Sequence, residues 1–294
     1  MISSKLLAAL TTDLYPTDSS SPRYLVALID MATLPEETQQ KLASNPLTRL
    51  QPLLLAPGLE KLQPLGAHLV CPREATRRGH NALIDSLAPY DSNTIVAWIT
   101  SAVSADLLAQ HLSQATLADT ENGERYLLRY YDSRVTPVLL HHAPKQWREW
   151  FLAPVVSWWL RGATSSHEQW LRIHGGARST PTIPPPLVIG ADLWWALDND
   201  PLPHRILETL NEASPAVFSS PCHGVRLAMI ESLLTEGKKL GLVDHDDLID
   251  FVIVRLQNTA EQLAQQSNWH AALQRSLKGE GRLSQLYQHG VKRP

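Results

Sequence analysis

Three continuous apolar runs in the first part of the chain constrain its fold most, because each has the length of a strand and precedes a helical pattern. The runs are Tyr24–Asp30, Gly66–Pro72 and Thr94–Thr100. The helical patterns cover 34–43, 74–88 and about 104–115. Such alternation is typical of layered α/β folds. The order is too irregular for a doubly wound Rossmann topology, and no glycine-rich phosphate loop follows a strand. We predict an α/β (α+β) lobe with a mixed sheet and flanking helices over 22–142.

The remainder of the sequence predicts helices. Residues 145–152 place Trp147, Trp150 and Phe151 on one helical face. Glycines and prolines crowd Gly175–Pro186, which predicts an extended connector. Further helices are expected over about 190–197, 203–212, 223–239 and 245–275. The predicted domains are an α/β domain over 1–155, a Trp- and Pro-rich connector over 156–188 and an all-α C-terminal lobe over 189–294.

Size and charge exclude several classes of protein. A chain of 294 residues is long enough for two lobes, and a net charge of −3 gives no footprint for nucleic acid or an anionic membrane. Cys71 and Cys222 belong to no metal-spaced cluster, so we expect free thiols. No segment approaches the roughly 20 apolar residues that cross a bilayer, and the first residues predict a short helix rather than a signal peptide. We expect a soluble cytoplasmic protein without membrane insertion.

The stretch Arg125–Val135 gathers an unusual set of side chains. A strand is predicted over 124–131 after the Asn122-Gly123 turn, and a corner follows with Tyr131, Asp132 and Arg134. Such a group can bind a substrate or can be structural. The residues favour a structural corner, in which Asp132 accepts backbone N–H groups and Arg134 binds a carboxylate or a chain end.

Few residues are arranged for catalysis. His245-Asp246, with Asp247 and Asp250 nearby, resembles the paired ligands of metal-dependent phosphohydrolases, but acidic capping of a helix explains it better. His141-His142 cannot chelate one ion, because adjacent side chains point apart.

Other catalytic signals are equally weak. No Gly-x-Ser-x-Gly elbow or phosphate-binding loop occurs, and Cys222-His223 alone is a weak signal. The basic group Arg73, Arg77, Arg78 and His80 is expected to be a solvated helix face. This lack of catalytic signals, together with 9 Trp against 3 Phe, indicates a binding protein.

Several spaced motifs together carry a family resemblance. They are Tyr24–Asp30, Pro57-Gly58-Leu59, Gly66–Val70, the Trp98 strand and above all Arg129-Tyr130-Tyr131-Asp132-Ser133-Arg134-Val135. Over roughly residues 22–155 the chain resembles the bacterial type VI secretion adaptors, also called effector chaperones, which carry domain of unknown function 4123. Members usually show an aromatic-Tyr-Asp-Pro-Arg-Val signature, and Ser133 stands where proline is common.

The resemblance implies a non-catalytic role without cofactor or metal. Such adaptors bind a cognate toxic effector in the cytoplasm of a Gram-negative bacterium and help to load it onto the trimeric VgrG-type spike protein. Two alternatives stay open: a metal-dependent hydrolase using the His245-Asp246 region, and a structural subunit of a larger assembly.

The partner surface of such an adaptor needs exposed apolar or aromatic anchors. Its candidates are Trp147, Trp150, Trp158, Trp159 and Trp170, together with the helical lobe. A tryptophan at helical spacing is more often core than interface, so both roles stay open. Trp158 and Trp159 cannot face the same way on a helix, and one of them is the better candidate for an exposed anchor. The signature residues Tyr130, Tyr131, Asp132 and Arg134 are expected to be structural.

Overall fold

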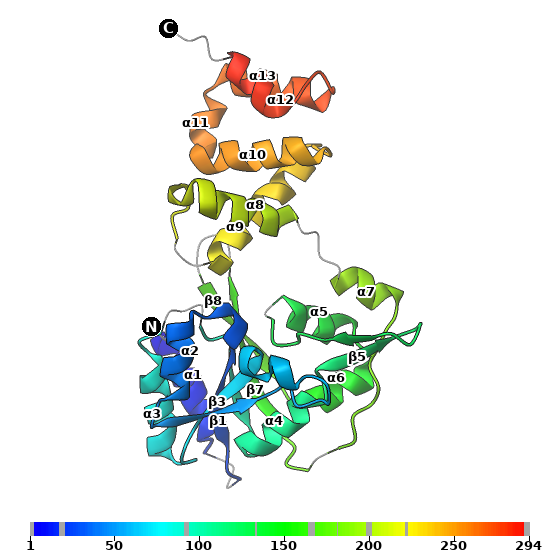
Figure 1. The fold of residues 1–294 in the computed structure, drawn as a ribbon. Helices are drawn as coiled ribbons and strands as arrows, with labels where there is room; N and C mark the ends of the chain where they lie inside the picture. The colour runs from blue at the N-terminus through cyan, green and yellow to red at the C-terminus, as the bar shows by residue number, and fades with distance from the viewer. Residues whose placement is uncertain are drawn as a thin grey trace. The chain divides into compact units, whose positions relative to one another are not determined.

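The computed structural model (Figure 1) describes residues 3–17, 21–90, 94–132, 134–163, 168–180, 182–197, 202–220 and 223–290. The chain forms two compact units. The first unit contains Met1–Gly162 and Gln169–Asn199, and the second contains Ala163–Glu168 and Asp200–Pro294. The first unit has sheets with flanking helices, and the C-terminal part is nearly all helical, which confirms the predicted fold class.

A six-stranded sheet forms the centre of the first unit, with strand order β2-β3-β1-β4-β7-β8. Its strands are β1 (Tyr24–Asp30), β2 (Thr48–Pro52), β3 (Ala67–Pro72), β4 (Ala97–Ser101), β7 (Val155–Ala163) and β8 (Glu168–His174). The pairs β1–β3, β1–β4, β2–β3 and β4–β7 are antiparallel. The first apolar run, Tyr24–Asp30, is therefore an inner strand that pairs with β3 on one side and β4 on the other.

Both faces of this sheet are buried because alternate side chains of β1 enter different clusters. Val26 and Leu28 pack in the cluster that contains the helices α4 (Ala105–Ser113), α5 (Val135–His142) and α6 (Lys145–Phe151). Leu25, Ala27 and Ile29 pack in the other cluster, with α1 (Ser4–Leu14), α2 (Glu36–Ala43) and α3 (Arg77–Leu87). Figure 1 shows the two groups of helices on opposite sides of the sheet. A two-sided core explains why β1 lacks polar alternation.

A second, three-stranded sheet contains β5 (Leu117–Thr120), β6 (Arg125–Leu127) and β9 (Val188–Ile189), in the order β6-β5-β9. The β5–β6 pair is antiparallel and the β5–β9 pair is parallel, so the unit mixes both orientations. The helix α7 (Ala191–Leu197) follows β9 directly and buries Leu193 in the core. Two short 3₁₀ turns, Met31–Thr33 and Glu60–Leu65, complete this unit.

The second unit packs its own apolar core among helices. Its helices are α8 (Leu202–Ala213), α9 (His223–Lys239), α10 (His245–Gln257), α11 (Ala260–Ala264), α12 (Ser267–Leu277) and α13 (Leu283–Gly290), with a 3₁₀ turn over Pro215–Val217. Ile230, Phe251 and Val252 lie at the centre of this core.

Two predicted boundaries are wrong. The segment 156–188, predicted as a connector, contains most of β7 and all of β8, because β7 adds to β4 as a further strand of the sheet. The single helix predicted over 245–275 is three helices. It breaks at Thr259, whose side chain caps α11 in a capping box with Gln262. Apolar residues recur at helical spacing on both sides of the break, so the sequence pattern alone did not show where one helix ends and the next begins.

The two-sided burial of β1 gives a first prediction. Leu28→Ala removes a fully buried side chain and is expected to lower the free energy of unfolding of the first unit by about 2–5 kcal/mol. Urea unfolding followed by tryptophan fluorescence measures it, since Trp269 is the one tryptophan of the nine that lies in the second unit. The control Leu55→Ala trims an exposed side chain, and equal effects of the two variants would contradict the described core.

Candidate partner-binding site

The strand predicted over 124–131 is shorter in the structure. Gly123 adopts a left-handed φ of +79° in the turn before it, which confirms the Asn122-Gly123 turn. The strand β6 ends at Leu127, and the chain then runs into the core. The predicted alternation therefore fails after Leu127, since Tyr130 and Tyr131 are both buried.

Tyr130 is the centre of an aromatic group inside the first unit. Its ring makes edge-to-face contacts with Phe151 at 5.2 Å and with Trp158 at 6.5 Å between centroids. Tyr131 packs against the same ring at 5.6 Å. Complete burial raises the pKa of Tyr130 well above its ordinary value, so the phenol stays neutral. Tyr130 and Tyr131 are thus buried parts of the apolar core of the first unit.

Asp132 and Arg134 form a closed corner. The Asp132 carboxylate accepts hydrogen bonds from the Arg134 backbone N–H (2.9 Å), its Nε (2.9 Å) and a terminal guanidinium nitrogen (2.5 Å). Burial alone raises the pKa of Asp132, but the hydrogen bonds from Arg134 outweigh that effect and hold the pKa below its usual value. In this geometry Asp132 and Arg134 bind each other, and the structural role of the signature stays a prediction. Ser133 lies outside the described residues.

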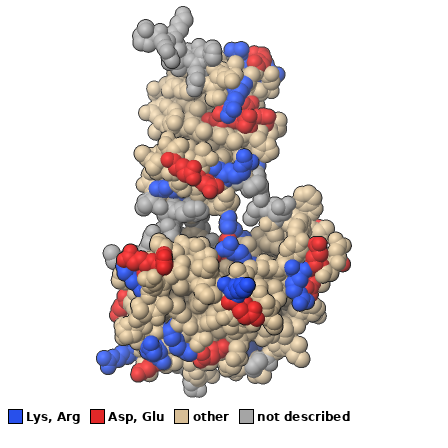
Figure 2. Space-filling view, viewed as in Figure 1, with Lys and Arg blue, Asp and Glu red and all other residues tan. Residues whose placement is uncertain are grey.

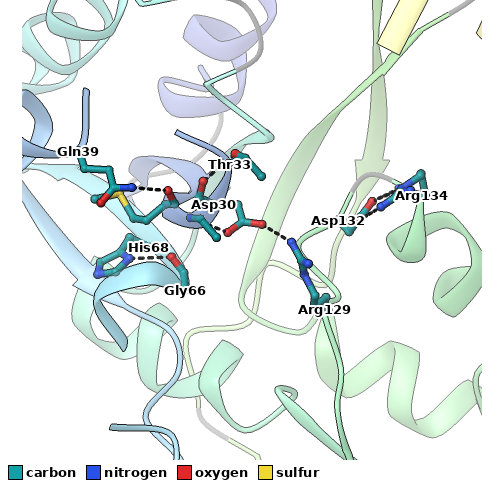
Figure 3. A network of polar contacts seen from close by, with 10 residues as sticks. Asp30, Thr33, Gln39, Gly66, His68, Arg129, Asp132 and Arg134 are labelled. Carbon is teal, nitrogen blue, oxygen red and sulfur yellow. Dashed lines mark hydrogen bonds and ion pairs between the residues drawn. The ribbon is translucent and has the colours of Figure 1, made fainter. Parts of the chain in front are cut away.

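Arg129 joins this corner to the central sheet (Figure 3), a link that the sequence interpretation missed. Its guanidinium lies 2.5 Å from the carboxylate of Asp30 at the end of β1. Asp30 also accepts the N–H of Ala32, and His68 donates from Nδ1 to the Gly66 carbonyl at 3.0 Å. The sequence contains one signal for this link. Asp30 is the last residue of an apolar strand, and a carboxylate buried there needs a cationic partner.

The tryptophans expected at a partner surface lie mainly in the core. Trp147 stacks on Phe151 at 4.8 Å between ring centroids, and Trp150 donates its Nε1–H to the Thr182 carbonyl. Trp147, Trp150 and Trp158 are at most 5 % exposed. A ring buried to that extent has no surface for a partner, so the prediction of exposed anchors is wrong for these three residues.

Trp159 and Trp170 are partly buried against the other core cluster. Because 155–163 is a strand rather than a helix, Trp158 and Trp159 point to opposite faces of the sheet. Trp159 donates its Nε1–H to the buried carboxylate of Asp13 at 2.9 Å. Arg172 and Ser157 bind the same carboxylate, which ties α1 to β7 and β8. Trp159 therefore serves an internal polar network.

Exposed aromatic residues gather elsewhere in the first unit. Trp195 is 76 % exposed, Trp194 is 42 % exposed and Tyr126 is 40 % exposed. The rings of Trp194 and Tyr126 meet edge to face at 5.4 Å, which places α7 beside the hairpin of β5 and β6. We refer to Tyr126, Trp194 and Trp195 as the surface aromatic cluster. Tryptophan and tyrosine are enriched at protein–protein interfaces, so this cluster is a candidate contact surface.

The sequence contained a signal for this cluster. Leu193 and Leu197 are four residues apart and form the core-facing stripe of α7. The adjacent Trp194 and Trp195 cannot share that stripe, so at least one had to face outward. The density of tryptophans between 147 and 170 drew the prediction to a segment whose rings are buried or partly buried.

The acidic residues of the second unit have structural partners. Asp244 caps α10 by accepting the N–H groups of Asp246 and Asp247, which confirms the capping interpretation. Asp247 accepts Ser276 Oγ and the N–H of Leu283, both at 2.7 Å, and Asp250 binds Arg282. Asp244, Asp246 and Asp247 line a cavity of about 400 Å³. Within the described part of the chain, no group of three or more His, Cys, Asp or Glu is placed to hold a metal ion.

The remaining candidates are ordinary parts of the fold. Cys71 is a free, buried thiol whose pKa burial raises to about 11, and Cys222 lies outside the described residues. His141 and His142 end α5. Arg77 stacks over the Tyr15 ring at 5.2 Å, and His80 is buried on α3. Basic and acidic side chains are interspersed on the face shown in Figure 2.

Comparison with known families gives one match. Residues 25–149 match the profile of the family described as Domain of unknown function (DUF4123). Residues 25–149 are therefore similar to a DUF4123 domain. This confirms the resemblance drawn from the signature, and the family is associated in general with type VI secretion. The domain runs from β1 into α6, so it contains Asp30, the corner and Tyr126, whereas Trp194 and Trp195 lie beyond it.

Two further comparisons and a search for membrane spans complete this picture. Neither the comparison with curated proteins nor that with solved structures finds a match. Among the described helices, none is long and apolar enough to cross a bilayer.

The corner of the DUF4123 domain gives a pH-dependent prediction. Asp132→Asn is expected to lower the free energy of unfolding at neutral pH by about 1–3 kcal/mol, because Arg134 loses a charged and only partly exposed partner. The pKa of Asp132 is lowered on folding, so its contribution is complete above the ordinary value of about 3.9 and is lost as the pH falls through the folded value.

Denaturant unfolding of both proteins from pH 7 downward tests this. The difference between wild type and Asp132→Asn should narrow once the pH falls below the ordinary aspartate pKa. The matched control is Asp119→Asn, which removes an exposed carboxylate paired with Arg125 and should change stability little. A difference that persists unchanged in acid would contradict the role of the Asp132 charge.

Proposed function

We propose that this protein is a non-catalytic adaptor, or chaperone, that binds a cognate type VI secretion effector in the bacterial cytoplasm and helps to load it onto the VgrG-type spike. The observation that carries this proposal is the DUF4123 match over residues 25–149. Because this family is associated with type VI secretion, we expect the partner to be a secreted effector. Binding to the spike is part of the same proposal.

The surface aromatic cluster supports a role in binding another chain. Tryptophan and tyrosine offer large contact areas with few rotatable bonds, so ordering them on binding costs little entropy. The two rings of Trp194 and Tyr126 already hold one another in place. A preformed apolar surface of this kind suits a protein that must recognise a partner without chemistry.

The internal use of polar groups supports a non-catalytic role. The signature acid is bound by Arg134, and Asp30 is bound by Arg129. In the second unit, Asp247 and Asp250 stabilise the start of α13 through Leu283, Ser284 and Arg282. Carboxylates that are engaged in this way stabilise the fold. No observation favours the hydrolase alternative at His245-Asp246, and metal analysis of the purified chain tests it directly.

Capture from the native cell tests the adaptor function. The tagged full chain, purified from native cytosol, is expected to bring down one large toxin-like protein identified by mass spectrometry. Deletion of the gene that encodes this protein should remove that toxin from the secreted fraction, while the spike and tube components are still secreted. Recovery of the chain alone, or unchanged secretion of every toxin, would contradict the adaptor function.

Substitution of the surface aromatic cluster tests its part in capture. Trp195→Ala should lower the recovered toxin by roughly tenfold, because a central aromatic anchor contributes on the order of 1–2 kcal/mol or more to binding. The matched control is Leu47→Ala, which trims a different exposed apolar side chain. Equal capture by both variants would place the partner surface elsewhere.

A further inference from the structure

The strand β6 is an edge of the three-stranded sheet. The hydrogen bonds on either side of β6 show which of its backbone groups face β5 and which face away. Leu128 N–H donates to the Thr116 carbonyl, and Thr120 N–H donates to the Glu124 carbonyl, both at 2.8 Å. In an antiparallel pair, hydrogen-bonded positions alternate with positions whose groups point away from the partner. With Ala118 opposite Tyr126, the N–H and C=O groups of Arg125 and Leu127 therefore point away from β5.

The other edge of the sheet confirms this phase. Asp119 lies opposite Arg125, and its N–H turns away from β6 to donate to the Leu187 carbonyl at 3.1 Å. The outward groups of Arg125 and Leu127 have no second strand within the described part of the chain. All three residues of β6 are exposed. This edge offers two donors and two acceptors to an added strand.

The two faces beside this edge differ. Leu127 and Arg125 share one face with Asp119, because cross-strand partners lie on the same side of a sheet. Tyr126 lies on the opposite face, against Trp194 of α7. An added strand would therefore place alternate side chains beside the surface aromatic cluster and beside Leu127.

The segments around the edge are acidic. Residues 117–127 and 188–197 contain four carboxylates (Asp119, Glu121, Glu124 and Asp192) and one guanidinium, that of Arg125. The Arg125 side chain is bound to Asp119 at 2.7 Å. Glu124 accepts the Tyr126 hydroxyl at 2.9 Å, which places a carboxylate directly beside the aromatic rings. Aromatic faces next to a carboxylate are a site for lysine or arginine.

We infer that β6 accepts an extended segment of a partner protein as an added strand, in which lysine or arginine side chains on the surface aromatic cluster alternate with apolar side chains beside Leu127. This inference rests on the proposed function for the identity of the partner as an effector. The backbone would supply affinity and the alternation would supply specificity. A second copy of this chain is a poor occupant, because it would bring the same four carboxylates to the edge.

A peptide experiment tests the strand addition without the effector. The probe is a short fluorescein-labelled peptide that alternates lysine and valine, and the control peptide alternates glutamate and valine. Anisotropy with the full chain should show binding of the first peptide only. Leu127→Pro removes an outward N–H and should weaken binding by roughly tenfold, whereas Leu127→Ala keeps that N–H and should weaken it by no more than about twofold. Glu124→Gln should also weaken binding.

Amide hydrogen exchange supplies a second measurement. In the free chain the amides of Arg125 and Leu127 should exchange quickly and that of Tyr126 slowly, and the lysine-valine peptide should slow the first two. Circular dichroism checks that Leu127→Pro is folded. If it is not, a peptide with alternate N-methyl groups replaces that variant and should bind roughly tenfold more weakly to the unchanged chain.

Several results would overturn the inference. They are equal binding of both peptides, no binding of either, fast exchange of Arg125 and Leu127 in the complex, or a dimer of the free chain that Leu127→Pro converts to a monomer. Because the peptides are synthetic, these results do not depend on effector capture. Capture of an effector together with failure of the peptide tests would leave the adaptor function intact and reject strand addition.

Discussion

The burial of β1 on both faces is the constraint on which the rest of the first unit depends. Val26 and Leu28 require cover on one side of the sheet, and Leu25, Ala27 and Ile29 require it on the other. Two layers of helices meet that requirement. The charged end of the strand, Asp30, needs a partner at the edge of the core, and Arg129, the residue before the signature, supplies it. The Arg129–Asp30 pair thereby joins the corner of Asp132 and Arg134 to the central sheet.

Much of the fold could be predicted because its periodic segments are local. The apolar runs became β1, β3 and β4, and the amphipathic segments became helices with nearly the expected bounds. Most of what failed depended on distant partners, although the break in the helix predicted over 245–275 comes from a local capping box at Thr259. From sequence alone, the tryptophans at 158 and 159 were interpreted as part of a helix. The segment is a strand because it pairs with β4, and this pairing buries Trp158. The corner of Asp132 and Arg134 was predictable because its hydrogen bonds span two residues. The Asp30 partner of Arg129 was not, since 99 residues separate them.

The aromatic residues therefore divide into two roles that composition alone cannot separate. Trp147, Trp150, Phe151 and Trp158 fill the interior around Tyr130. Trp194 and Trp195 follow β9 on a short helix whose core-facing positions are already occupied by leucines, so these rings remain at the surface. The region that matches DUF4123 contains Tyr126, and the segment after it contains the two exposed indoles. A partner that spans both would contact residues inside and outside the family domain.

Photo-crosslinking from position 195 in the native bacterium tests the central claim most directly. A photoreactive residue replaces Trp195 in the full chain, and a second protein carries it at the exposed position of Leu47 as a control. The account predicts a crosslink from position 195 to one secreted toxin, within a segment that alternates basic and apolar residues, and none from position 47. Crosslinks to that toxin from position 47 alone, or no crosslink to a secreted toxin from position 195, would contradict it.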